Sequence, residues 1–482
     1  MVTTYRTPGV YVEEISKFPP SIAAVDTAIP AFIGYTQKAE DGRGGDLTLK
    51  PTRIESLVEF EQMFGKAQPE EKIKINVVEV TEKDNSGAVP GLTVTATLPE
   101  EDKSKHILYY ALQHFYANGG NAAYIVSVGP FNDTFGSAPD PEMLKDGLEP
   151  LEREDEPTLI VIPEAQGLGT LSEFSTLEAA VLTQCASLKD RFTIMDLHGG
   201  TSSLNDGNAD LAKMVKGFRD EGMGTEELKF GAAYAPNLQT VLDYTISADL
   251  IDVTRTVDGV RQNVGAKLSS YGDKDTQLYQ RAISEIRGIP LTLPPSGAIA
   301  GIYAKVDAER GVWKAPANVP IIGVIRPTID FAKSTNDRMN VDVGGKSINA
   351  IRPFVGKGTL VWGARTLAGN DNEWRYVSVR RFFNFAEESI KKATEQFVFE
   401  PNDANTWVRV QAMIENFLTT QWRAGALQGV KPEHAFYVSV GLHKTMSAQE
   451  ILDGLMIIEI GLAVVRPAEF IVLRFSHKLA ES

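Results

Sequence analysis

The middle of the chain alternates between short apolar runs and segments whose apolar residues recur at helical spacing. The apolar runs predict buried strands over residues 158–162, 192–197 and 230–234. The helical spacing predicts helices over residues 175–188, 209–219 and 277–287. Strands that alternate with helices in this way are typical of a parallel α/β sheet.

The first part of the chain has a mixed pattern. Strands are predicted over residues 21–36, 72–80, 92–98 and 123–128, and helices over residues 52–65 and 105–117. Thr52 and Glu55 have the spacing of a capping box for the first helix, and Gly65 is placed to end it. The two strands around Asn85-Ser86-Gly87 predict a small β insertion.

The last third of the chain predicts long helices between strands. Strands are predicted over residues 360–363, 374–379, 438–441, 455–464 and 469–475. One helix runs to about Phe399, and Pro401 separates it from a second helix capped by Asn402 or Asp403.

Two strand-like segments lie almost at the ends of the chain, Val10–Ile15 and Glu469–Phe475. A strand needs a partner for its N–H and C=O groups, and neither segment lies in an obvious local hairpin. They pair either with the body of this chain or with the bodies of neighbouring chains. The second arrangement would make the chain a polymer-forming subunit.

Six stretches of the chain follow one another in a specific order: Thr7–Glu14, Asp26–Gly34, Pro294–Tyr303, Gly311–Asn318, Val379–Arg381 and Val465–Phe475. In this combination the chain resembles the contractile tail sheath proteins, which form the outer sleeve of contractile phage tails and related injection machines. The resemblance covers both ends and most of the last third, and the middle matches much less clearly.

The resemblance implies a mixed α+β fold, with an inner sheath domain built from both chain ends and outer α/β domains inserted into it. Residues 131–157, which are rich in Pro, Gly, Asp and Glu, are predicted to be a linker or a surface loop. The predicted division is a strand arm at 1–20, a first part of the body at 21–130, the linker at 131–157, an outer α/β domain at 158–290, an inner domain at 291–465 and a second strand arm at 466–482.

The resemblance also implies that the arms join sheets of neighbouring copies by β-augmentation. The residues expected in these contacts are Val10, Tyr11, Val12 and Ile15 in the N-terminal arm, and Phe470, Ile471, Val472, Leu473 and Phe475 in the C-terminal arm. Without the resemblance, residues 469–475 are interpreted as a core strand of their own domain.

A short charged helix near the C-terminus is implied to face an inner tube, and residues 447–454 match it. Glu450 and Asp453 lie three residues apart on one helical face and are the candidate tube contacts. Ser447 and Glu450 also have the spacing of a capping box, which is the alternative role of Glu450.

The implied function is structural. The chain would polymerise with itself as a six-fold helix around an inner tube protein, between baseplate and tail terminator or cap proteins, and contract to drive the tube through a target envelope. The resemblance implies no enzyme activity, cofactor, nucleic acid partner or membrane insertion. Two other classes stay open: an α/β enzyme with an unrecognised active site, and another structural component such as a baseplate or capsid protein.

Composition narrows these classes. A length of 482 residues predicts two or three domains, and the net charge of 48 − 63 = −15 disfavours nucleic acid or anionic membrane as the main partner. The only cysteine, Cys185, excludes an internal disulfide and favours synthesis in a reducing cytoplasm, which the resemblance implies is bacterial. No signal peptide or long apolar span is visible, so a protein of this sequence that acts outside the cell is expected to leave by lysis or within a particle.

Other motifs give weak signals. Gly344–Ser347 resembles the end of a phosphate-binding loop, but Asn340 stands where that loop needs glycine. Cys185 lies in an apolar helical pattern that favours a buried side chain, and Ser296 lacks the flanking glycines of a nucleophile elbow. The six histidines include no pair at the i,i+4 spacing of a helical metal site.

Overall fold

The computed structural model describes residues 22–81, 91–200, 207–330 and 333–474. The chain divides into two compact units. The smaller unit combines residues 1–25 with Ala386–Val465, and the larger unit combines Asp26–Phe385 with Arg466–Ser482. The predicted boundaries after residues 130, 157 and 290 therefore fall inside one unit, and the inner domain predicted over 291–465 is divided between two.

A nine-stranded sheet forms the centre of the larger unit, in the order β13-β16-β15-β8-β7-β6-β1-β5-β2. Its strands are β1 (Pro30–Thr36), β2 (Thr52–Ile54), β5 (Ala123–Pro130), β6 (Leu159–Val161), β7 (Phe192–Met195), β8 (Gly231–Ala235), β13 (Val319–Pro320), β15 (Ile348–Phe354) and β16 (Gly358–Val361). The six neighbours from β15 to β5 run parallel, and β2, β16 and β13 pair antiparallel with β5, β15 and β16, respectively. The mixed fold and the parallel α/β sheet are confirmed, and the sheet extends far outside residues 158–290.

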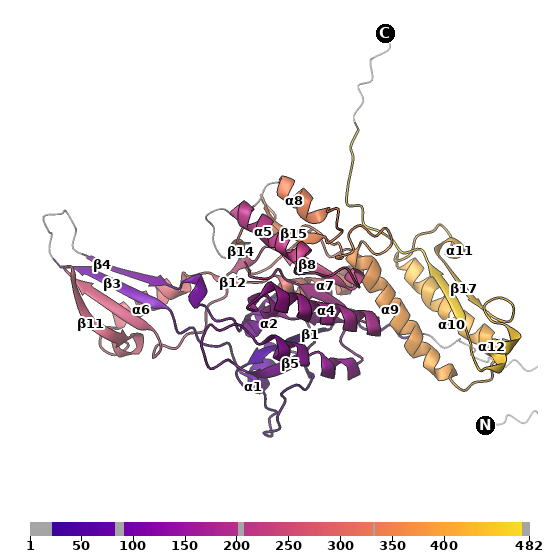
Figure 1. Cartoon of the computed structure of the whole chain (residues 1–482), viewed down its shortest axis with the longest axis horizontal. Helices are drawn as coiled ribbons and strands as arrows, with labels where there is room; N and C mark the ends of the chain where they lie inside the picture. Colours follow the sequence, from indigo (N-terminus) through magenta and orange to yellow (C-terminus); the bar gives the residue numbers. More distant parts are fainter. Residues whose placement is uncertain (1–21, 82–90, 201–206, 331–332, 475–482) are drawn as a thin grey trace, which may run out of the picture. The chain divides into compact units, whose positions relative to one another are not determined.

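Helices cover both faces of this sheet because its parallel strands are apolar on both sides (Figure 1). In β1, Ala31 and Ile33 belong to one core and Phe32 belongs to the other. The first core includes residues of α3 (Pro141–Asp146), α4 (Leu171–Leu188), α5 (Gly207–Asp220) and α8 (Lys333–Asn340). The second core includes residues of α1 (Leu57–Phe64), α2 (Leu108–Ala117) and α7 (Ser296–Arg310).

A separate core lies beneath a four-stranded sheet of the larger unit, ordered β11-β10-β3-β4 and packed against α6. Its elements are β3 (Lys74–Val80), β4 (Gly91–Thr97), β10 (Asp252–Val257), β11 (Val260–Lys267) and α6 (Thr276–Arg287). The predicted strand pair is confirmed as the antiparallel pair β3–β4, whereas β10 and β11 were not predicted. A three-stranded sheet of β12 (Leu291–Leu293), β9 (Leu238–Thr240) and β14 (Val324–Pro327) completes this unit.

The smaller unit is mainly helical and carries one β-hairpin. Its elements are the end of α9 (Val377–Thr394), then α10 (Ala404–Arg423), α11 (Pro432–Ala435), β17 (Phe436–Val440), α12 (Ala448–Leu452) and β18 (Ile458–Leu462). The two predicted helices and the break at Pro401 are confirmed. The cap of α10 is Asp403, whose carboxylate accepts hydrogen bonds from the N–H groups of Asn405 and Thr406 at 3.0 Å each.

The linker predicted over residues 131–157 is wrong. Helix α3 and a 3-10 turn at Glu149–Arg153 bury Leu144, Leu148 and Leu151 against the first core of the larger unit. The three leucines recur at helical spacing, but the polar composition of the segment made this pattern hard to recognise in the sequence. The segment therefore belongs to the packed body of the unit.

Two predicted element starts are also wrong. Thr52 does not cap a helix, because residues 52–54 pair with β5, and Ser56 accepts the hydrogen bond from the N–H of Glu59 instead. Residues 374–379 do not form a strand, because α9 begins at Val377. Ile54 and Val377 are buried in these segments, but each apolar pattern covers too few residues to distinguish a strand from the start of a helix.

Candidate assembly interface

Four consecutive apolar side chains near the C-terminus are exposed. Phe470–Leu473 expose between 71% and 80% of their surface, and residues 466–474 form no strand with the described part of the chain. Figure 1 shows this segment as a single extended trace. Alternate residues of an extended segment point to opposite faces, so both faces are apolar and uncovered. The alternative of a core strand in its own domain is wrong for residues 469–474.

Glu469 holds the base of this segment. Its carboxylate accepts hydrogen bonds from Arg365, with Nη2–Oε2 at 2.6 Å and Nε–Oε1 at 3.0 Å, and from the Asn340 amide at 2.6 Å. The Tyr376 hydroxyl donates a further bond at 3.3 Å. Burial alone would raise the pKa of Glu469, but the hydrogen bonds from Arg365 and Asn340 outweigh it and lower the pKa. The group is therefore a charged carboxylate at neutral pH.

The hairpin of the smaller unit has unpaired edges. Strands β17 and β18 pair antiparallel, with Phe436 opposite Leu462 and Val440 opposite Ile458. Among the described residues neither strand has a second partner. An isolated hairpin is marginally stable in water, and its edges present free N–H and C=O groups to which another strand can add.

The two faces of this hairpin differ. Val438 and Val440 are 9% and 4% exposed, and α10, which packs on β17, donates a hydrogen bond from Gln411 to the Val438 carbonyl at 3.3 Å. On the opposite face Tyr437 is 53% exposed, and its hydroxyl donates to Glu459 at 2.7 Å. A strand added to this hairpin would therefore present alternate side chains to a helix-covered core and to an open face.

Thr27, near the first described residue, is also fixed by buried charges. Arg381 donates to the Thr27 carbonyl at 2.7 Å and forms a bidentate ion pair with Asp307 at 2.5 and 3.0 Å. The Thr27 hydroxyl donates to Asp307 at 2.6 Å. The predicted arm residues Val10, Tyr11, Val12, Ile15 and Phe475 lie outside the described residues. Their part in assembly stays a prediction.

The predicted tube-facing helix is α12, a single turn with an exposed surface. Glu450 completes a capping box: its carboxylate accepts from the Ser447 N–H at 2.7 Å, and the Ser447 hydroxyl accepts from the Glu450 N–H at 3.3 Å. The backbone hydrogen bond from Ser447 lowers the pKa of Glu450. Asp453 is exposed and accepts a bond from the Gln449 amide at 2.9 Å. Contact of either residue with a tube stays a prediction.

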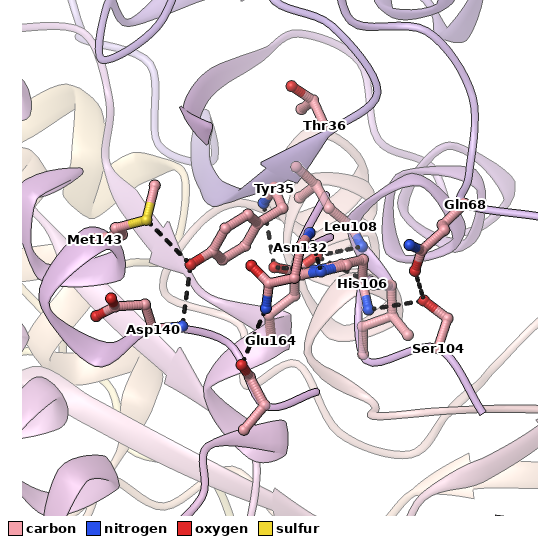
Figure 2. Close-up of polar contacts among 12 residues, drawn as sticks. Tyr35, Thr36, Gln68, Ser104, His106, Leu108, Asn132, Asp140, Met143 and Glu164 are labelled. Carbon is pink, nitrogen blue, oxygen red and sulfur yellow. Dashed lines mark hydrogen bonds and ion pairs between the residues drawn. The ribbon is translucent and has the colours of Figure 1, made fainter. Parts of the chain in front are cut away.

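The carboxyl ends of parallel strands, where α/β proteins commonly bind ligands, carry a buried polar cluster here. Figure 2 shows Glu164, which follows β6, bonded to the backbone of two other segments. Its carboxylate accepts from the N–H groups of Tyr35 and Ile107, each at 3.1 Å, and so caps α2, which has no capping side chain of its own. His106 accepts from the Asn132 N–H at 3.1 Å. These contacts give the cluster a structural role in joining loops.

A cavity of about 400 Å³ opens near this cluster. The amides of Gln166 and Asn237 on its wall bind each other in both directions, at 2.9 and 2.8 Å. Neither Cys185 nor Ser296 lines the cavity. The cavity therefore brings together none of the nucleophiles considered from the sequence.

Three buried carboxylic acids have raised pKa values. Burial raises the pKa of Glu70 and of Asp196 to about 7. Burial, followed by the nearby Asp196 carboxylate, raises the pKa of Glu178 to about 8. Asp196 accepts a hydrogen bond from the Ser296 N–H at 3.0 Å at the start of α7. Folding therefore favours the protonated form of all three acids.

Lys346 and Cys185, the other candidate residues from the sequence, lie where their side chains have structural roles. Lys346, in the turn Gly344–Ser347, donates to the main-chain carbonyls of Arg219 and Met223, and Cys185 is fully buried. Within the described ranges no three His, Cys, Asp or Glu side chains gather as a metal site. In the same ranges we find no helix with the length and apolar character needed to span a membrane.

Comparison with known proteins gives consistent matches. Residues 369–478 match the family model of the phage tail sheath C-terminal domain. The tail sheath protein of Vibrio phage KVP40 is 27% identical over 174 residues, which are 36% of this chain and 23% of that protein. The matched region thus spans about a quarter of the phage relative.

Two solved structures match almost the whole chain. A chain of the six-fold symmetrised anti-feeding prophage baseplate is 30% identical, with a TM-score of 0.62 over 99% of this chain and 100% of that chain. A chain of the contracted PVC sheath complex, from an extracellular contractile injection system, is 28% identical, with a TM-score of 0.63 over 99% of both chains.

Proposed function

This chain belongs to the contractile tail sheath protein family, and we propose that it is a sheath subunit that polymerises helically around an inner tube and contracts. The observation that carries the proposal is the unpaired C-terminal segment, with four exposed apolar residues at Phe470–Leu473. The same chain also offers a hairpin, β17–β18, with unpaired edges. A strand without a sheet and a sheet without neighbouring strands are complementary between copies.

The side-chain pattern favours one orientation of the added strand. Ile471 and Leu473 share a face of the extended segment, and Phe475 continues that apolar set in the sequence. The opposite set, Phe470 and Val472, ends at Arg474. We therefore place Ile471 and Leu473 on the side of Val438 that α10 covers, with Phe470 and Val472 on the open face beside Tyr437.

The hairpin has two edges and the chain has two arms, so we assign one edge to the C-terminal arm of one neighbour and the other to the N-terminal arm of a second. Such contacts are head-to-tail and build an open helix rather than a closed dimer. A six-fold arrangement agrees with the symmetry of the matched baseplate structure.

The proposed work of the subunit is mechanical. Free energy stored at assembly drives contraction, in which subunits move as near-rigid bodies that the arms keep connected. No catalysis, nucleotide or cofactor is part of this proposal. The other proposed partners are the inner tube, the baseplate and a tail terminator or cap, and the proposed place of synthesis is the bacterial cytoplasm. For the tube contact we favour Asp453, because the Glu450 carboxylate is occupied by its cap.

Negative-stain electron microscopy of the full chain, alone and with its tube partner, tests the proposal. We expect hollow helical tubes, with a narrower and longer-pitch form when the tube is present. A chain that lacks residues 1–16 is expected to fold but not to polymerise. Dispersed monomers of the full chain in both samples would contradict the proposal.

A further inference from the structure

The C-terminal arm leaves the larger unit at a buried ionic site, which we call the root and define as Arg365, Glu469, Asn340 and Tyr376. We propose that the root fixes the direction of the C-terminal arm, so that the strand is presented in an extended form to the next copy. The identity of that partner rests on the proposed function. The extended conformation of the arm does not depend on the proposed function, because all four root residues belong to one chain.

Three separate segments meet at the root. Asn340 is the last residue of α8, Tyr376 immediately precedes α9, and Arg365 lies between β16 and α9. The side chain of Arg365 is 5% exposed, and its guanidinium donates hydrogen bonds to both oxygens of Glu469. A bidentate pair of this kind fixes orientation as well as distance, because the planar guanidinium matches the carboxylate geometry.

The root is itself tied to the centre of the parallel sheet. Asn349 in β15 accepts a hydrogen bond from the Arg365 N–H at 2.8 Å and donates to the Arg365 carbonyl at 2.8 Å. The same amide donates to the Ala233 carbonyl in β8 at 3.2 Å. A pull on the arm therefore reaches two neighbouring strands through one side chain, rather than ending in a surface loop.

A flexible attachment of the arm would not require a buried ion pair. A flexible linker keeps its charges in water, whereas Arg365 is buried and depends on Glu469 to balance its charge. The position of Glu469, directly before Phe470, places the fixed point at the first residue of the exposed apolar run. The root therefore preorganises the strand that the neighbour captures, which reduces the ordering cost of binding.

The root can be tested by distance measurements on the unassembled full chain. Spin labels are placed at the exposed positions Arg474→Cys, at the far end of the apolar run, and Lys357→Cys, while the native Cys185 is buried and does not label. Double electron–electron resonance spectroscopy then gives the distribution of distances between the two labels. We expect one narrow distribution in the parent, and a broad one after Glu469→Gln, which keeps the shape of the side chain but removes its charge.

The matched control is Glu79→Gln. This change breaks the Arg255–Glu79 ion pair of the four-stranded sheet, which does not touch the arm. Its N–O distance of 2.6 Å equals that of the Arg365–Glu469 pair. It should leave the distribution between the labels unchanged. Tyr376→Phe, which removes a single hydroxyl, is a milder second variant in case Glu469→Gln does not fold, and should broaden the distribution partially. A broad distribution in the parent, or a narrow one retained in both root variants, would overturn the proposal.

A second experiment measures the concentration needed for sheath assembly. It distinguishes a failure of the root proposal from a failure of the proposed function. If the root variant populates the extended arm about tenfold less, the concentration needed for sheath assembly should rise by roughly tenfold. Parent protein that never forms tubes but shows the narrow distribution would refute the proposed function and support the root. Tubes that form at the same concentration with Glu469→Gln would refute the root and support the proposed function.

Discussion

Replacing Ile471 and Leu473 together by alanine should weaken sheath assembly strongly without affecting the fold of the subunit. Their side chains are 80% and 72% exposed, so nearly all their surface remains to be buried in a neighbour. Full burial of such a side chain contributes about 1.5–3 kcal/mol, which gives about 1–2 kcal/mol for each residue here after allowing for the retained Cβ. The pair then contributes about 2–4 kcal/mol per contact, or roughly 30- to 700-fold in Kd.

The assay is the concentration at which the full chain sediments as tubes, checked by electron microscopy, with circular dichroism to verify folding. The matched control is Phe470→Ala with Val472→Ala, on the opposite face of the same segment. Because we place that face beside the exposed Tyr437, we expect an effect below about tenfold. An equal or larger effect of the control pair would refute the proposed orientation. Normal assembly of both double variants would refute the role of the arm.

Three further outcomes test the packing on which the assembly interface depends. Asp307→Asn leaves Arg381 buried without its counter-charge and should cost about 3–5 kcal/mol in urea unfolding; a cost below about 1 kcal/mol would contradict this view of the pair. Burial raises the pKa of Glu178 from 4.5 to about 8, so the folded state retains a proton that the unfolded state releases, and stability should fall as pH rises from about 4.5 to 8. Glu178→Gln should flatten this decline in urea midpoints, and an unchanged slope would show that other groups cause it. Leu144→Ala should cost about 2–5 kcal/mol, whereas the exposed Val58→Ala should cost far less; equal costs would restore the linker interpretation of residues 131–157.

The parallel sheet could be predicted where strand and helix signals lie close together in the sequence. The strands now labelled β6, β7 and β8 are short apolar runs separated by helices, and local periodicity identifies them. The sheet continues through β1 and β15, which pair with β6 and β8 from residues 30 and 348 onward. No local pattern specifies these partners, because pairing depends on tertiary packing across more than 100 residues.

The same dependence on distant pairing partners explains why β10 and β11 of the four-stranded sheet were not predicted. Residues 252–257 include only two apolar side chains, Val253 and Val257, between charged residues and threonines, so the segment lacks the apolar run expected of a strand. Its pairing with β3, almost 180 residues earlier, supplies the stabilisation that the local sequence does not show. Polar segments become strands in this way when a distant partner buries one face.

The candidate interface was only partly visible in the sequence. The residue types of Phe470–Leu473 predict a strand, the family resemblance implies that this strand is an arm, and in the structure its four side chains are exposed. The root could not be predicted because Arg365 and Glu469 are separated by 104 positions, and a single acidic residue directly before Phe470 carries no pairing signal. Likewise, the cap that Glu164 provides for α2 joins residues 57 positions apart, so it could not be read from the start of the helix.

The most direct test of the account is a cryo-electron microscopy map of the assembled tube at a resolution that traces the main chain. We predict that residues 470–474 of one copy continue as a strand on the β17–β18 hairpin of a neighbouring copy, with Ile471 and Leu473 on the side of α10. A C-terminal segment that folds back onto its own chain, or that contacts a neighbour without joining its hairpin, would contradict the account.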